Sequence, residues 1–141
     1  MTEETKKPLF DFSSFRKTQE NQESGREFEI LDDAGRKTNV YFTIHGVSSS
    51  RYRTGQDELR AKHRLEQRLT EPTYEQGIED MALALSWCVS GWRTGEEKVI
   101  FLNGESMSHS RENVETLLKQ SDMLRGQVRM RVDNGAGFTD A

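Results

Sequence analysis

The sequence predicts an α+β fold, in which an N-terminal two-strand β-hairpin is followed by a mainly helical body. The prediction rests on an alternating apolar pattern around a turn, apolar residues at helical spacing in mid-chain, and serine-capped segments near the end. With 141 residues, 33% of them hydrophobic and 31% charged, the chain can build one modest core. We therefore predict a flexible, disordered N-terminal tail at 1–26, a single domain at 27–138 and a C-terminal end at 139–141.

The hairpin is predicted from alternating residues on both sides of a turn. Phe28 and Ile30 alternate with glutamates, and the alternation resumes after a turn that contains Gly35. Glycine suits this turn because it readily adopts the positive φ that short hairpin loops need. The residues of the second strand that we expect to face the core are Val40, Phe42 and Ile44.

Two long helices are predicted after the hairpin. The serines at 48–50 can cap a helix that runs to about Leu69 and stops before a proline. Gly55 is expected to weaken its first turns by about 1 kcal/mol relative to alanine. The next helix has the clearest apolar face and is predicted to end at Gly91 as a left-handed C-cap. That face consists of Tyr74, Ile78, Met81, Ala82, Leu85 and Val89.

Shorter elements are predicted in the last third of the chain. Residues 99–102 are interpreted as a brief strand or a buried loop. Ser108 or Ser110 can cap a helix after it, and Ser121 can cap a second one.

Composition narrows the class of protein. The net charge of -4 lacks the positive field of a dedicated nucleic-acid binder. One cysteine, no membrane-length apolar run and no secretory signal predict a soluble protein of a reducing cytoplasm, without membrane contact. A local basic segment at 51–68 is interpreted as a solvated face, with an acidic partner or RNA as alternatives. Its charges are Arg51, Arg53, Arg60, Lys62, Arg64 and Arg68.

No constellation typical of an enzyme or a metal site is visible in the sequence. The heptapeptide SWCVSGW, residues 86–92, places Cys88 at the C-terminal end of a helix, where the helix dipole disfavours a thiolate. The histidines lack the spacing of metal ligands; they are His45, His63 and His109. We predict no enzymatic activity and no cofactor. Trp87 and Cys88 are interpreted as structural, and Trp92 as a core-edge residue or one exposed to a partner.

One apolar cluster interrupts the polar N-terminal segment. It lies in LFDFSSF, residues 9–15. Either this segment docks on a partner or it folds back onto its own domain, and the sequence leaves both open.

Taken in order, several segments resemble the tail assembly chaperones of tailed bacteriophages over residues 27–138. The series begins with the predicted hairpin and includes SWCVSGW, SRENVETLL and MLRGQV. The residues that carry the resemblance are Gly91, Trp92, Ser110, Arg111, Glu112, Asn113, Leu117, Leu118, Gln127, Val128 and Phe138.

The resemblance implies a non-enzymatic protein of the bacterial host cytoplasm that is absent from the mature virion. Such a chaperone coats the tape measure protein, keeps it soluble and helps to recruit tail tube subunits. Coating a long partner needs many copies, so we also expect a homo-oligomer. The residues that we predict to bind the partner, because they cluster around helix ends, are Trp92, Phe101, Leu117 and Met123.

Two other functions stay open at this point. The chain can be a structural virion component of a phage tail or head-tail connector, for which a hairpin with helices would also serve. It can also be a small nucleic-acid-binding regulator that uses the basic segment, although the acidic total charge argues against this.

Overall fold

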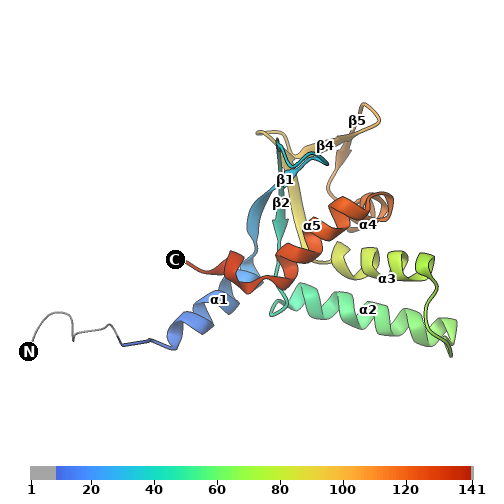
Figure 1. The fold of residues 1–141 in the computed structure, drawn as a ribbon, viewed down its shortest axis with the longest axis horizontal. Coiled ribbons are helices and arrows are strands. Elements are labelled where there is room, and N and C mark those ends of the chain that lie inside the picture. Colours follow the sequence, from blue (N-terminus) through green and yellow to red (C-terminus); the bar gives the residue numbers. More distant parts are fainter. Residues whose placement is uncertain (1–8, 141) are drawn as a thin grey trace, which may run out of the picture.

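The computed structural model of the chain describes residues 9–140 and has the predicted α+β class. Two antiparallel sheets of three and two strands pack with the helices around one core (Figure 1). The predicted order, a hairpin followed by helices, is only partly matched because strands also occur later in the chain. In chain order the elements are α1 (Ser13–Ser24), β1 (Arg26–Leu31), β2 (Lys37–Ile44), α2 (Ser50–Glu66), α3 (Tyr74–Ser86), β3 (Val89–Thr94), β4 (Val99–Leu102), β5 (Glu105–Ser108), α4 (Arg111–Gln120), α5 (Asp122–Asp133) and the 3₁₀ helix η2 (Gly135–Phe138).

The predicted hairpin is confirmed, and it forms two strands of a three-stranded sheet in the order β1-β2-β3. Gly35 has a φ of 79° in the turn, as expected for its role there. Phe28, Phe42 and Trp92 lie opposite one another across the three strands. Phe42 and Ile44 are buried and Val40 is half-buried, so the second strand does face the core.

The predicted helix through Gly91 is wrong, because α3 ends at Ser86 and β3 begins at Val89. Gly91 lies in β3 opposite Thr43 and has no left-handed conformation. The change of structure occurs at Cys88. Its N–H closes the helix on Leu85, and its carbonyl accepts a hydrogen bond of 2.8 Å from the backbone N–H of His45. Pairing with β2 therefore replaces continuation of the helix.

A second hairpin, β4 and β5, follows the sheet. Residues 99–102 form its first strand, which is one of the two predicted alternatives. Asn103 and Gly104 connect the strands with φ values of 54° and 80°. Positive φ at both central residues is the geometry of a type I′ hairpin turn, for which Asn-Gly is the preferred sequence.

The helices α2 and α3 lie side by side and form an antiparallel pair (Figure 1). Ser49 caps α2 by accepting a hydrogen bond from the N–H of Tyr52, and α2 ends at Glu66, shortly before the predicted Leu69. Gly55 faces Ala84 of α3 so closely that a Cβ atom would lie 2.6 Å from the Ala84 carbonyl oxygen. A side chain at this position would therefore push the two helices apart.

The helices α4 and α5 begin at serine caps, as predicted. Ser110, rather than Ser108, caps α4 by accepting from the N–H of Asn113, and Ser121 caps α5 by accepting from that of Leu124. Both helices bury one apolar face against α3 and the sheet. Their buried side chains are Val114, Leu118, Val128 and Val132.

The predicted flexible tail contains an ordered helix, α1, so this expectation is wrong for residues 13–24. Residues 1–8 of the predicted tail, and Ala141 of the C-terminal end, lie outside the described residues. The helix is attached at its C-terminal end by polar side chains: Asn21 donates to the carbonyl of Phe138 (2.8 Å), and buried Gln22 accepts from the N–H of Ser48 (2.8 Å). Its N-terminal end extends away from the body (Figure 1).

Candidate partner-binding groove

The main candidate site is an apolar groove of about 550 Å³ between the three-stranded sheet, β4 and the helices α4 and α5. Nine of its fifteen lining residues are apolar. This volume falls within the range of about 300–1,000 Å³ that is typical of small-molecule and cofactor sites. The apolar lining residues are Ile30, Leu31, Val40, Phe42, Ile100, Phe101, Leu117, Met123 and Leu124.

The structure brings three of the four predicted partner-binding residues together in this groove. Phe101 comes from β4, Leu117 from α4 and Met123 from the first turn of α5. Phe101 and Met123 are 56% and 54% exposed. Exposed apolar side chains that cluster around a hollow are typical of a surface that binds another molecule.

Trp92, the fourth predicted residue, is not on the surface. It lies in β3 and not at a helix end, and it is only 4% exposed. Its indole Nε1 donates a hydrogen bond of 3.1 Å to the carbonyl of Met107, and its ring centroid lies 5.5 Å from that of Phe42. Since Phe42 lines the groove, Trp92 supports the wall from behind, and a partner cannot reach it directly in this conformation.

Gln127 of α5 closes one end of the groove, and we did not identify it as a site residue from the sequence. Its side-chain amide accepts from the N–H of Leu31 (3.0 Å) and donates to the Leu31 carbonyl (2.8 Å). Leu31 is the last residue of β1, which is an edge strand. The amide thus takes the place of a neighbouring strand and fixes α5 to the sheet. No spacing rule predicts such a contact between residues 96 positions apart in the chain.

Gln127→Ala is expected to lower the free energy of unfolding by about 1 kcal/mol, because two hydrogen bonds of a partly exposed backbone group are lost. The backbone amide of Leu31 should exchange faster with solvent in the variant, as measured by hydrogen exchange. Gln120→Ala, an exposed glutamine at the end of α4, is the control and should change neither quantity. Unchanged exchange at Leu31 would show that Gln127 does not hold this end of the groove.

The charged residues that line the groove are both acidic, Asp32 and Asp33. The carboxylate of Asp32 accepts hydrogen bonds from the backbone N–H groups of Arg36 and Ala34, which hold its pKa below its ordinary value. Its other oxygen is 3.2 Å from the Arg36 guanidinium. Asp33 forms no ion pair with another residue in 9–140 and gives this rim of the groove a negative charge.

The reactive side chains considered in the sequence lie elsewhere. Cys88 is fully buried, and burial raises the pKa of its thiol to about 12, so the thiol is a poor nucleophile. Among residues 9–140, no group of three His, Cys, Asp or Glu side chains is placed to hold a metal ion. Each histidine instead bonds a neighbouring group of the fold; these residues are His45, His63 and His109.

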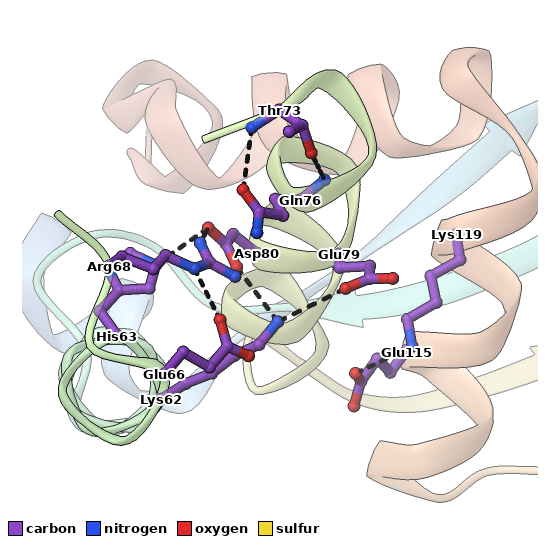
Figure 2. A network of polar contacts seen from close by, with 10 residues as sticks. All are labelled: Lys62, His63, Glu66, Arg68, Thr73, Gln76, Glu79, Asp80, Glu115 and Lys119. Carbon is purple, nitrogen blue, oxygen red and sulfur yellow. Dashed lines mark hydrogen bonds and ion pairs between the residues drawn. The ribbon is translucent and has the colours of Figure 1, made fainter. Parts of the chain in front are cut away.

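Much of the basic segment at 51–68 contacts the protein itself. Arg51 donates to the carbonyl of Trp87 at 2.5 Å, while Lys62 and Arg68 bind the carboxylate of Asp80 (Figure 2). These contacts hold the α2–α3 pair together and reduce the charge that α2 can offer to an anionic partner.

No helix within residues 9–140 has the length and apolar character needed to cross a membrane. The groove combines apolar walls with an acidic rim. Comparison of the chain with family models, curated proteins and solved structures found no match.

Proposed function

We propose that the protein is a non-enzymatic tail assembly chaperone of a tailed bacteriophage. In this proposal it binds apolar helical faces of the tape measure protein, keeps that protein soluble and helps to recruit tail tube subunits. It works in the cytoplasm of the bacterial host and leaves before the virion matures. The observation that carries the proposal is the convergence of Phe101, Leu117 and Met123 on one apolar groove.

The shape and chemistry of the groove suit an amphipathic helix. Such helices place apolar side chains at i, i+3, i+4 and i+7 into an apolar groove, which is a recurrent mode of recognition. Full burial of one large apolar side chain contributes about 1.5–3 kcal/mol, before the cost of ordering is subtracted. Met123 adds an adaptable surface, because the unbranched thioether side chain can repack against different partners. Such a groove can accept many similar apolar segments along one long client.

The first test is co-expression with a fragment of the longest helical protein encoded directly downstream in the same genome. We expect a soluble complex with several copies of this chain per fragment, measured by size-exclusion chromatography with light scattering. A fragment that stays insoluble while this chain elutes alone would contradict the proposal and favour the virion component. Detection of the chain in purified particles would favour the same alternative.

The groove itself is tested by replacing its two most exposed apolar side chains. The double variant Phe101→Ser with Met123→Ser should weaken binding of the fragment by about tenfold or more, because apolar anchors carry most of the energy of such contacts. The control is Leu65→Ser with Leu69→Ser, which changes two side chains that are 86% and 95% exposed outside the groove. Equal binding by both double variants would remove the groove from the proposal.

The nucleic-acid alternative draws little support from the arrangement of α2. A phosphate-binding surface needs basic side chains that are not already engaged. Arg51, Lys62 and Arg68 make contacts within the fold. The protein-binding role thus has the stronger physical basis.

A further inference from the structure

The N-terminal end of α1 carries an exposed cluster of three aromatic rings, which we call the aromatic knob and which consists of Phe10, Phe12 and Phe15. The side chains are 63%, 73% and 60% exposed. Their ring centroids nevertheless lie only 5.0–5.8 Å apart, so the rings pack on one another and form a preformed apolar surface. A contiguous apolar patch of this kind is typical of a docking surface.

The aromatic knob does not reach the groove of its own chain. The 12 residues of α1 extend over about 18 Å, and the knob lies at its N-terminal end, where Phe10 and Phe15 line a hollow with residues 135, 139 and 140 of the C-terminal segment. The groove begins at the opposite end of β1, and Figure 1 shows α1 pointing away from β1 and β4. The joint between α1 and β1 is fixed, because Arg26 donates to the carbonyl of Thr139 at 2.5 Å and contacts the carboxylate of Asp140.

The charges beside the aromatic knob complement those of the groove. Arg16 and Lys17 follow Phe15 directly and form no ion pair with another residue in 9–140. Asp11, between the first two rings, accepts a hydrogen bond from the N–H of Ser13, so residues 10–17 together carry a net charge of +1. The charged residues that line the groove, Asp32 and Asp33, are acidic. Seating the knob in a groove would bring opposite charges together at the rim, which favours this pairing and its orientation.

We propose that the aromatic knob of one copy occupies the apolar groove of a second copy. Because knob and groove are different surfaces of the same chain, the contact is head-to-tail and can be repeated from copy to copy. The occupant covers the exposed side chains of Phe101 and Met123 while no client is bound. On the basis of the proposed function, a client helix then displaces the knob and takes the same groove.

The size of the contact fits an exchangeable occupant. An aromatic side chain buries roughly 150–250 Å² when it is fully covered. Because the three rings are only 60–73% exposed, docking can bury about 300–500 Å² of the knob, below the roughly 800 Å² per partner of a standard stable interface. The association should therefore be weak and depend on concentration, so that a longer apolar client can replace it.

The experiment measures mass against concentration in the absence of a client. The wild-type chain should rise above its monomer mass of 16.3 kDa as concentration increases, measured by light scattering. The triple variant Phe10→Ser, Phe12→Ser and Phe15→Ser, called the knob variant, should weaken self-association by about tenfold or more. The control with serine at Leu65 and Leu69 should behave as wild type. A wild-type chain that stays monomeric, or a knob variant that associates as well as wild type, would overturn the proposal.

A mixing experiment identifies the two surfaces that meet. The groove variant, Phe101→Ser with Met123→Ser, keeps its knob, and the knob variant keeps its groove. Each variant alone should remain at 16.3 kDa, and the mixture should form a dimer of twice that mass without further growth. A mixture that stays monomeric under conditions where wild type associates would overturn the pairing of knob with groove.

Binding of the client fragment to the same variants separates this inference from the proposed function. The knob variant should bind the fragment at least as tightly as wild type, because its groove has no competing occupant. If the groove variant loses self-association but still binds the fragment, the groove assignment in the proposed function fails and the knob contact stands. If it loses the fragment while self-association persists, the proposed function stands and the knob contact fails.

Discussion

Asp80→Asn is expected to lower the free energy of unfolding by about 3 kcal/mol, the typical effect of removing one partner from a buried ionic network. Asp80 is 8% exposed on α3, and three cationic or hydrogen-bonding side chains converge on its carboxylate (Figure 2). The contacts are Lys62 at 3.2 Å, His63 at 2.9 Å and Arg68 at 2.5 Å. Asparagine carries no charge, and its N–H₂ group would point a donor at other donors. Chemical denaturation measures the change.

A neighbouring residue supplies the control. Glu79 also contacts Lys62, at 3.8 Å, but its side chain is 53% exposed. Glu79→Gln should change stability by less than about 0.5 kcal/mol, since exposed ion pairs contribute little. Equal losses in the Asp80 and Glu79 variants would contradict a special role for the buried carboxylate.

The contribution of Asp80 should also depend on pH. Burial alone would raise the pKa of this carboxyl group, but hydrogen bonds from Arg68, His63 and Lys62 outweigh it and lower the pKa from 3.8 to about 2. Because the pKa is lower in the folded than in the unfolded state, the stabilisation is present above pH 3.8 and is lost as pH falls through about 2. The stability difference between wild type and Asp80→Asn should therefore shrink across this window, and a constant difference would contradict the ionic origin.

Gly55→Ala is expected to lower the free energy of unfolding by about 2 kcal/mol, although alanine favours helices. An added Cβ would lie 2.6 Å from the carbonyl oxygen of Ala84 and 3.3 Å from Cβ of Trp87. The oxygen belongs to the backbone of α3, so it cannot rotate away as a flexible side chain would. The helices must separate, and the change is measured by denaturant titration.

Two other helical glycines serve as controls, because alanine is expected to have the opposite effect on stability there. Gly77 of α3 and Gly126 of α5 have no atom within 4 Å of an added Cβ. Alanine at either site should raise stability by about 0.5–1 kcal/mol through its helix propensity. If Gly55→Ala were stabilising like these two, the close approach of α2 and α3 would be wrong.

Local patterns predicted the elements whose signals lie in adjacent residues. The first hairpin follows from alternation and one glycine, and the helix caps at Ser110 and Ser121 follow from hydroxyl groups placed before apolar runs. The second hairpin was missed, although its Asn103-Gly104 pair is a strong turn signal, because β5 itself is short and polar. Phe101, Leu117 and Met123 were identified, but their convergence depends on packing of three distant elements.

Two of the wrong predictions, the helix through Gly91 and the flexible tail at 13–24, have a physical cause that local patterns do not contain. Val89 follows Leu85 by four residues, so it continues the helical period, although pairing with β2 makes it the first residue of a strand. In α1, polar residues make the decisive contacts with the body, Asn21 and Gln22 among them. A hydrophobic pattern cannot reveal a helix that is held in place by hydrogen bonds of side-chain amides, one donating and one accepting.

The location of both indole rings near the α3–β3 connection has a spectroscopic consequence. Trp87 follows α3 directly, with Arg111 5.5 Å from its ring, and Trp92 lies within the core. Intrinsic emission excited at the tryptophan absorption band therefore reports the environment of this junction and of the core around Trp92. The segment from Leu9 to Gly25 contains neither tryptophan nor tyrosine. Release of α1 from the body should therefore leave the tryptophan emission unchanged. Far-ultraviolet circular dichroism detects that helix. A difference between the circular dichroism and the tryptophan emission during heating would separate melting of α1 from melting of the core.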